Sequence, residues 1–173
     1  GQITGWTLGH KTLNAYITGP NQVSWSIAGT PIDSQGNFLI CLPVSLPDSL
    51  LLAPDQIFTA GCSGGAVTFN PPDIKGNLIM SFIVTDGAAV IGEVRRNNFD
   101  TIFTGAFSII YLNTSKSTVV TGQKICGIDT LNFNVSAIPG WTPVVKNITK
   151  ISGSSVTYQF NNVVPGGSLW KFY

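Results

Sequence analysis

Apolar residues alternate with polar ones along most of this chain, and this period of two constrains the fold more than any other feature. In residues 155–160 (SVTYQF), Val156, Tyr158 and Phe160 share one face, and the intervening polar residues share the other. Residues 131–136 (LNFNVS) repeat the pattern. Because successive side chains of a β-strand point to opposite faces of a sheet, each run predicts a strand with one buried and one solvated face.

Two longer apolar runs and the turn signals between runs predict how the strands are organised. Residues 77–85 and 103–112 are almost continuously apolar, as expected for central strands covered on both faces. Clusters of Gly, Pro, Asn and Asp interrupt the runs at 19–21, 33–36, 86–87, 96–98, 139–140 and 165–167. One short helix is predicted over residues 47–52, with Asp48 or Ser49 as its cap and Pro54 as its stop. We predict an all-β protein, an antiparallel β-sandwich of about 11 to 13 strands with at most one short helix.

The length of 173 residues favours one domain, so we predict a single β-sandwich domain over residues 1–173. In the alternative, two sheet-rich lobes, 1–43 and 66–173, are joined by a crossover over residues 44–65. That crossover is richer in Pro and Gly than its flanks.

The composition predicts the setting of the protein. Charged residues make up 10% of the chain, against about 25% in an ordinary soluble domain. The surface must therefore be made polar by Ser, Thr, Asn and Gln, which favours a secreted or cell-surface protein. A net charge of +1 argues against nucleic-acid binding, which needs a dense basic patch. The longest apolar stretch, 77–84, is far shorter than the ~20 residues of a transmembrane helix.

Three cysteines allow one disulfide and leave one thiol. Cys62 and Cys126 each lie beside a glycine at a turn-like position, so we predict that these two form the disulfide. Cys41 lies within the apolar run 38–42 and is predicted to be a buried free thiol. No pair has the spacing of a metal site, and His10 is the only histidine, so we expect no metal and no cofactor.

One turn resembles a known family. Residues 2–5 (QITG) are followed by 29–38 (GTPIDSQGNF), in which Asp33, Gly36 and Phe38 fit an Asp-x-x-Gly-x-Phe turn. This pattern resembles the carboxypeptidase regulatory-like, or prealbumin-like, domains. There the Gly takes a positive φ, the Phe enters the core, and the fold is an immunoglobulin-like or prealbumin-like sandwich. Residues 71–76, Cys126 and 139–144 extend the likeness to exported proteins of Deinococcus- and Thermus-type bacteria, which implies an envelope or extracellular location.

The stretch 60–66 (AGCSGGA) places Cys62 and Ser63 on a glycine-rich turn, where a hydrolase could present a nucleophile. A nucleophile needs a general base and an orienting acid. The only candidate base, His10, lies between Gly9 and Lys11 in a segment that resembles an exposed loop. The acidic residues lie mostly in turns, and Glu93 has no evident partner for glycosidase chemistry. A turn stapled by a disulfide is the favoured interpretation, and we predict no catalytic residue.

Two sets of residues are candidates for binding and modification. Trp6, Trp141 and Trp170 lie near glycine-rich turns and could form an exposed platform for sugar rings; in the favoured alternative they pack in the core, as Trp25 is also predicted to do. The triplets at Asn113, Asn134 and Asn147 are N-glycosylation acceptors in a glycosylating host. Of these, Asn134 falls on the solvated face of its predicted strand.

The ends of the chain carry apolar residues that can enter a sheet, either within the molecule or in a neighbouring one. Edge strands without lysine have little to prevent edge-to-edge association. We therefore predict a non-enzymatic extracellular or cell-surface structural protein, a surface-layer or filament subunit that associates with itself or other surface proteins through strand edges. The alternative is a carbohydrate- or surface-binding module using exposed Trp, and the remote alternative is a small hydrolase using Ser63 or Cys62.

Overall fold

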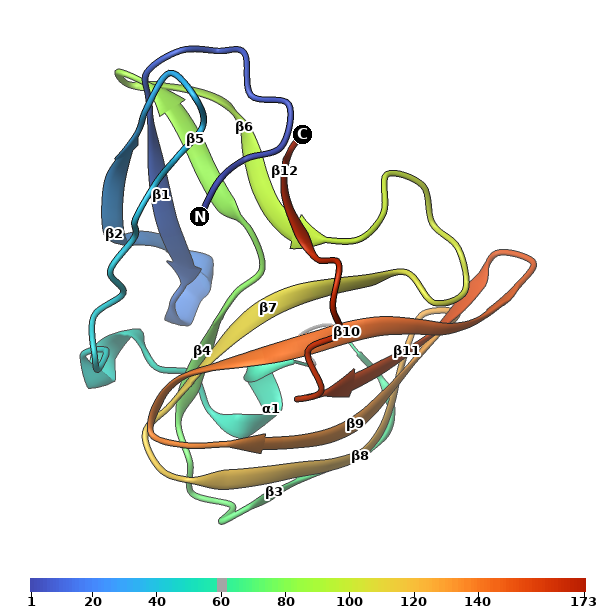
Figure 1. The fold of residues 1–173 in the computed structure, drawn as a ribbon. Helices are drawn as coiled ribbons and strands as arrows, with labels where there is room; N and C mark the ends of the chain where they lie inside the picture. Colours follow the sequence, from blue (N-terminus) through green and yellow to red (C-terminus); the bar gives the residue numbers. More distant parts are fainter. Residues whose placement is uncertain (59–61) are drawn as a thin grey trace.

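The computed structural model describes residues 1–58 and 62–173, which form an all-β protein with twelve strands in one sheet, as the alternation predicts (Figure 1). The strands are β1 (Lys11–Thr18), β2 (Ser24–Ile32), β3 (Gly64–Asn70), β4 (Gly76–Ile79), β5 (Phe82–Asp86), β6 (Ala89–Asn97), β7 (Phe107–Thr114), β8 (Thr118–Cys126), β9 (Asp129–Ala137), β10 (Gly140–Ser152), β11 (Ser155–Asn161) and β12 (Leu169–Phe172). The helical elements are α1 (Pro54–Ile57) and short 3-10 turns at Pro20–Gln22 and Asp48–Leu50.

The sheet is mixed rather than purely antiparallel. Its main path runs β2-β1-β5-β6-β7-β10-β11-β9-β8-β3, with β12 paired to β6 and β4 paired to β7. Among the described strand pairs, β9 and β11 are parallel. β11 forms a hairpin with β10 and lies between β10 and β9, so it points the same way as β9. The prediction of an antiparallel sheet was wrong at this pair, because period-two patterning does not specify which strands become neighbours.

Two buried clusters divide the molecule into an upper and a lower lobe in the view of Figure 1. The upper cluster contains Leu13, Ile32 and Val84, from β1, β2 and β5. The lower cluster contains Val120 and Phe133, from β8 and β9, and is capped by α1. The upper cluster includes Phe82 and Val84 of β5 and Val94 of β6, and the partly buried Trp170 and Phe172 of β12 pack against it, so residues far apart in the chain contribute to it.

Burial follows the alternation where a strand has one covered face. Phe133, Val135 and Ala137 of β9 are buried, whereas Asn134 and Ser136 are exposed. β7 is buried on both faces over most of its length, as a strand shared between clusters must be.

Three predicted elements differ from the observed ones in their bounds or in their type. The run 77–85 breaks into β4 and β5, because β4 pairs with β7 whereas β5 pairs with β1 and β6. The run 103–112 becomes a strand only from Phe107. The predicted helix 47–52 is a 3-10 turn at Asp48–Leu50, and Pro54 begins α1 instead of stopping a helix, since proline suits the first helical position.

Replacing Gly122 of β8 by alanine should destabilise the fold. Gly122 has φ +112°, and a Cβ there would lie 2.3 Å from the carbonyl oxygen of Ala66 on β3. We expect Gly122→Ala to lower the free energy of unfolding by about 2 kcal/mol in urea titrations. The control is Gly127→Ala, where φ is +64° but the space is open; it should cost about half as much. Equal losses would contradict a steric role for Gly122.

Candidate functional site

Both ends of the chain pair within the molecule. The Ile3 N–H donates to the Gly36 carbonyl oxygen at 3.0 Å, and the Thr4 N–H donates to that of Trp170 at 2.8 Å. Ile3 is 2% exposed. The N-terminal segment therefore joins β12 to the chain that follows β2, and no described terminal segment is left over for donation to a neighbour.

The turn at Asp33 holds this junction and has the conformation that the sequence predicts. The Asp33 carboxylate accepts hydrogen bonds from the backbone N–H groups of Gln35 and Asn37, both at 2.8 Å. Gly36 has φ +82°, and Phe38 is buried. The hydrogen bonds from the side chain and backbone of Asn37 hold the pKa of Asp33 below its ordinary value.

The charge of Asp33 should make this turn sensitive to acid. Because the pKa of Asp33 is lower in the folded state, its ionisation stabilises the fold at neutral pH, and this contribution disappears as the pH falls through the folded pKa. The wild type should therefore be more stable than Asp33→Asn at pH 7, with a difference that shrinks below about pH 4. Urea unfolding across this range measures it. A difference independent of pH would show that the charge has no role.

The two strands at the ends of the main sheet path, β2 and β3, each have one free edge and carry no charged residue. Among the described strands, β2 pairs only with β1, and β3 pairs only with β8. The sequences SWSIAGTPI and GGAVTFN contain no charged residue. β3 also lacks proline, and its side chains at Ala66 and Thr68 are exposed. β3 thus lacks the lysines and prolines that usually keep natural strand edges from pairing.

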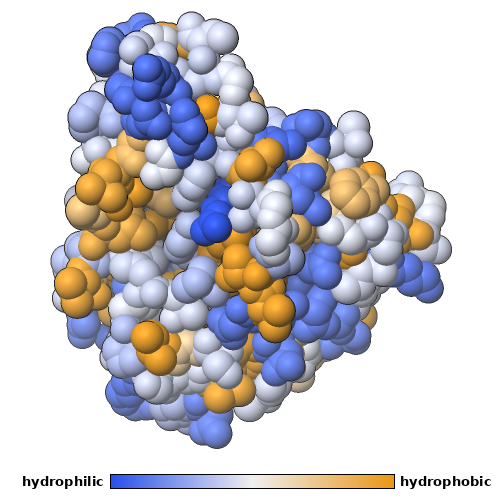
Figure 2. All heavy atoms as spheres, in the orientation of Figure 1, coloured by the Kyte–Doolittle hydropathy of each residue, from blue (hydrophilic) through white to orange (hydrophobic). Residues whose placement is uncertain are grey.

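A groove lies along β3. Its volume is about 470 Å³, and its lining includes the β3 residues from Gly65 to Phe69 together with Pro54 and Pro72. Two charged residues, Asp55 of α1 and Lys124 of β8, also line it. Figure 2 shows apolar side chains on one face of the molecule in separate groups divided by polar ones.

The predicted disulfide between Cys62 and Cys126 is present, with a sequence separation of 64 residues. Cys62 is therefore not a thiolate nucleophile. Ala60 and Gly61 of the glycine-rich stretch lie outside the described residues. The Ser63 N–H donates to the Ile125 carbonyl oxygen in the lower lobe, whereas His10 is exposed and directly precedes β1 in the upper lobe. The structure does not bring together the nucleophile and base of the hydrolase alternative.

The predicted tryptophan platform is not exposed. Trp6, Trp141 and Trp170 are half-buried and pack against the upper cluster. The indole N–H of Trp6 donates to the Gly9 carbonyl oxygen at 2.8 Å, and that of Trp141 donates to Pro43 at 2.8 Å. Trp170 packs edge-on against two phenylalanine rings. The core alternative describes these three residues better.

Trp25 and Cys41 were predicted to be buried, and both predictions were wrong. Trp25 is 49% exposed because β2 is an edge strand and this residue lies on its outer face. Cys41 is exposed because residues 38–42 form no strand; Phe38, Ile40 and Leu42 turn toward the upper cluster, and Cys41 points away from it.

The three glycosylation candidates lie in different settings. Asn134 is exposed on β9, as predicted. Asn113 is 2% exposed on β7, between β4 and β10, so a glycan there is incompatible with the fold. Asn147 is half-buried, and its side-chain oxygen is buried without a hydrogen-bond partner. Asn134 is the only one of the three that the fold leaves open to a glycan.

A second cavity, of about 440 Å³, lies beside the β1–β2 turn and is here named the neutral cavity. Its lining includes the amide side chains of Asn21, Gln22 and Gln56, and contains no charged residue. Asn21 and Gln22 have φ values of 63° and 62°, a conformation that non-glycine residues rarely adopt. Sequence reasoning missed this group, although the Gly-Pro-Asn-Gln turn marks its position.

The described residues contain neither a metal-binding group nor a spanning helix. No three His, Cys, Asp or Glu side chains in 1–58 and 62–173 gather as a metal site requires. No helix in the same ranges is long and apolar enough to cross a membrane. Comparison with known proteins finds no matching family, no matching curated protein and no matching solved structure. The resemblances drawn from the Asp33 turn, Cys126 and residues 71–76 and 139–144 therefore stay predictions.

Proposed function

We propose that the chain is a non-enzymatic structural protein of an extracellular or cell surface, which assembles by strand addition at the edge of β3. The observation that carries the proposal is the groove of about 470 Å³ along this unpaired, uncharged strand. An extended segment that enters such a groove can form main-chain hydrogen bonds along the exposed edge. The low charge of the chain and its disulfide support the surface setting.

The occupant of the groove is β2 of a second copy. β2 is the other end of the same sheet path, has a free edge, and carries no charge that would oppose pairing. Because β2 and β3 are different surfaces, their pairing is head-to-tail and leaves a free β2 and a free β3 at the two ends of every oligomer. Such contacts build open filaments unless the rotation closes a ring.

The test uses one added charge at two matched positions. Thr68 on β3 and Thr121 on β8 are register partners, and both side chains are exposed. β8 is already paired on both edges, whereas β3 is not. In sedimentation velocity and electron microscopy, the wild type and Thr121→Lys should form oligomers as the concentration rises, and Thr68→Lys should stay monomeric. A monomeric wild type, or equal association of the two variants, would overturn the proposal.

The neutral cavity favours a second candidate function, the binding of a neutral saccharide. Four side-chain amides line the cavity, and those of Asn21, Gln22 and Gln56 offer donors and acceptors to hydroxyl groups, whereas the Asn77 amide donates to the Thr18 and Leu50 carbonyl oxygens. No charged residue lines the cavity. The exposed Trp25 ring lies against Gly19 of the lining: a Cβ on Gly19 would be 3.3 Å from two ring atoms. Such a ring can stack on the apolar face of a sugar.

A glycan array tests this second function. The wild type and Val23→Ala, a change at an exposed residue of the same turn, should be retained by a neutral glycan, whereas Trp25→Ala should not. Retention that is unaffected by Trp25→Ala would exclude this site.

A further inference from the structure

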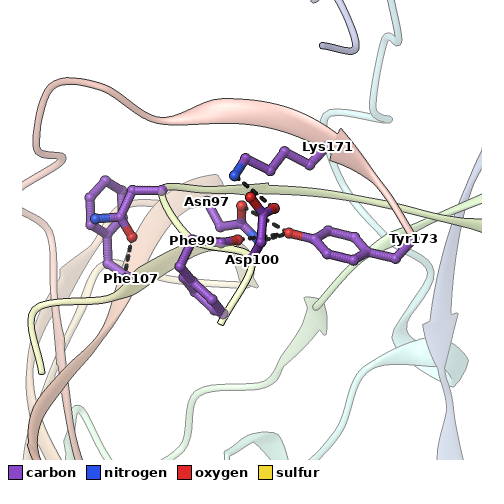
Figure 3. Close-up of polar contacts among 7 residues, drawn as sticks. Asn97, Phe99, Asp100, Phe107, Lys171 and Tyr173 are labelled. Atoms are coloured by element: carbon purple, nitrogen blue, oxygen red, sulfur yellow. Dashed lines mark hydrogen bonds and ion pairs between the residues drawn. The ribbon is translucent and has the colours of Figure 1, made fainter. Parts of the chain in front are cut away.

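The C-terminal residues hold the loop between β6 and β7 in place (Figure 3). The Tyr173 hydroxyl donates to the Phe99 carbonyl oxygen at 2.9 Å and accepts from the side-chain amide of Asn97 at 2.8 Å. The Lys171 ammonium pairs with Asp100 at 2.9 Å. The start of this loop is thus fixed from outside by the last strand of the protein.

Further hydrogen bonds join this loop to β7 and β10. The Phe107 N–H donates to the Asn98 side-chain oxygen at 2.8 Å. The Gly105 N–H donates to the Ile148 carbonyl oxygen of β10 at 2.7 Å. A loop tied at both ends can form a preorganised wall of a binding site, and a preorganised wall lowers the entropic cost of binding.

Under this loop lies a cavity of about 180 Å³, here named the cationic cavity. Phe99 and Ile102 of the loop provide apolar lining, and Arg95, Lys146 and Tyr158 provide polar groups. Ser108, which faces Lys146 in the β7–β10 register, adds a hydroxyl donor. The cavity therefore has one apolar side and a group of donors that includes two cations.

Lys146 is the unusual member of this group. Its ammonium lies 4.2 Å from the centre of the Tyr158 ring, and within the described chain it makes no hydrogen bond or ion pair with a carboxylate. Burial lowers the pKa of Lys146; the charge of Arg95 lowers it further, and that of Asp129 opposes both. Burial also raises the pKa of Tyr158, so its hydroxyl stays protonated at neutral pH.

The other charges near the cavity have partners of their own. Glu93 pairs with Arg95, and the Arg95 guanidinium also lies 5.7 Å from the centre of the Tyr173 ring. The Asp129 carboxylate accepts the Val156 N–H at 2.8 Å. Lys146 is thus a half-buried cation that no carboxylate of the described residues pairs directly, and an anion from outside would complete its contacts.

We propose that the cationic cavity binds a small organic carboxylate, whose anionic end lies between Lys146 and Arg95 and whose apolar end packs against Phe99 and Ile102. The size follows from the volume, because a cavity of about 150 Å³ holds benzene. A charge-assisted bond to a carboxylate satisfies the ammonium, and the apolar lining excludes a ligand that is charged all over, such as inorganic phosphate. This site is separate from the β3 groove and does not depend on assembly.

The test uses benzoate, its neutral analogue benzamide and inorganic phosphate in calorimetric titrations of the full chain. Benzoate should bind and the other two should not. Lys146→Met keeps an unbranched side chain that is one atom shorter and removes the charge; it should weaken benzoate binding about 10- to 100-fold. The control Lys150→Met, at an exposed position on the same strand, should bind as the wild type does.

A second measurement needs no variant. Because a bound carboxylate favours the charged ammonium, benzoate should raise the pKa of Lys146, followed by NMR of its side chain. Equal binding of benzamide, binding of phosphate alone, an unchanged pKa of Lys146 or no binding of benzoate would each overturn the proposal.

Discussion

Replacing Cys62 and Cys126 together by alanine should cost about 4 kcal/mol of unfolding free energy, the largest loss expected from any change considered for this chain. The disulfide closes a loop with a sequence separation of 64 residues. Without it, the unfolded chain gains the entropy of that open loop, which grows slowly with loop length. In the folded protein, the disulfide also ties Cys62, two residues before β3, to Cys126 at the end of β8. Its loss should therefore let the start of β3 fray.

Urea unfolding of the double variant measures this loss. The control is Cys41→Ala, because Cys41 is exposed and unpaired; it should change stability by no more than about 0.5 kcal/mol. Equal effects of the two changes would mean that the bridge does not constrain the unfolded chain in solution.

Truncating Ile3 to alanine should have the second largest effect, about 3 kcal/mol. Ile3 is 2% exposed and belongs to the upper cluster, although it is the third residue of the chain. Its removal leaves a cavity between the N-terminal segment and β12, which pair at Ile3 and Trp170.

The neighbouring Gln2 is an internal control, because its side chain is exposed. Gln2→Ala keeps the backbone pairing with Asn37 and should be close to neutral. Calorimetric melting of both variants at several protein concentrations also separates the two modes of terminal pairing. A melting temperature that rises with protein concentration because residues 1–4 pair with another molecule would contradict the intramolecular pairing.

The sequence predicted what depends on local chemistry. The alternation in β9 placed Phe133 and Val135 in the core, and the Asp33 turn has the predicted backbone. The disulfide was predicted because glycine-flanked cysteines at turns are easily joined. The first two features are specified by neighbours in the chain, whereas the disulfide joins residues 64 positions apart and was predicted from the local setting of each cysteine.

Features that depend on which strands become neighbours were not predictable in this way. Trp25 alternates with serines, a pattern that fits a buried face as well as the outer face of an edge strand. The sequence around Asn113 fits a glycan acceptor, but pairing of β7 with β4 and β10 places this residue in the interior.

The cationic cavity is formed by residues of four strands and a loop, so no local sequence motif predicts it. One local signal was present. Lys146 lies two residues from each of Val144 and Ile148, both buried, so a cation occupies a core-facing position in the alternation.

Backbone hydrogen exchange at low and high protein concentration tests most directly whether β3 is the assembly edge. In a monomer, the outward N–H groups of Gly64–Asn70 have no strand partner among the described residues, whereas residues 130–133 of β9 lie between two paired strands, β8 and β11. Raising the concentration should slow exchange in β3 and in β2 and leave β9 unchanged. Exchange in β3 that is equally fast at every concentration would contradict assembly through this edge.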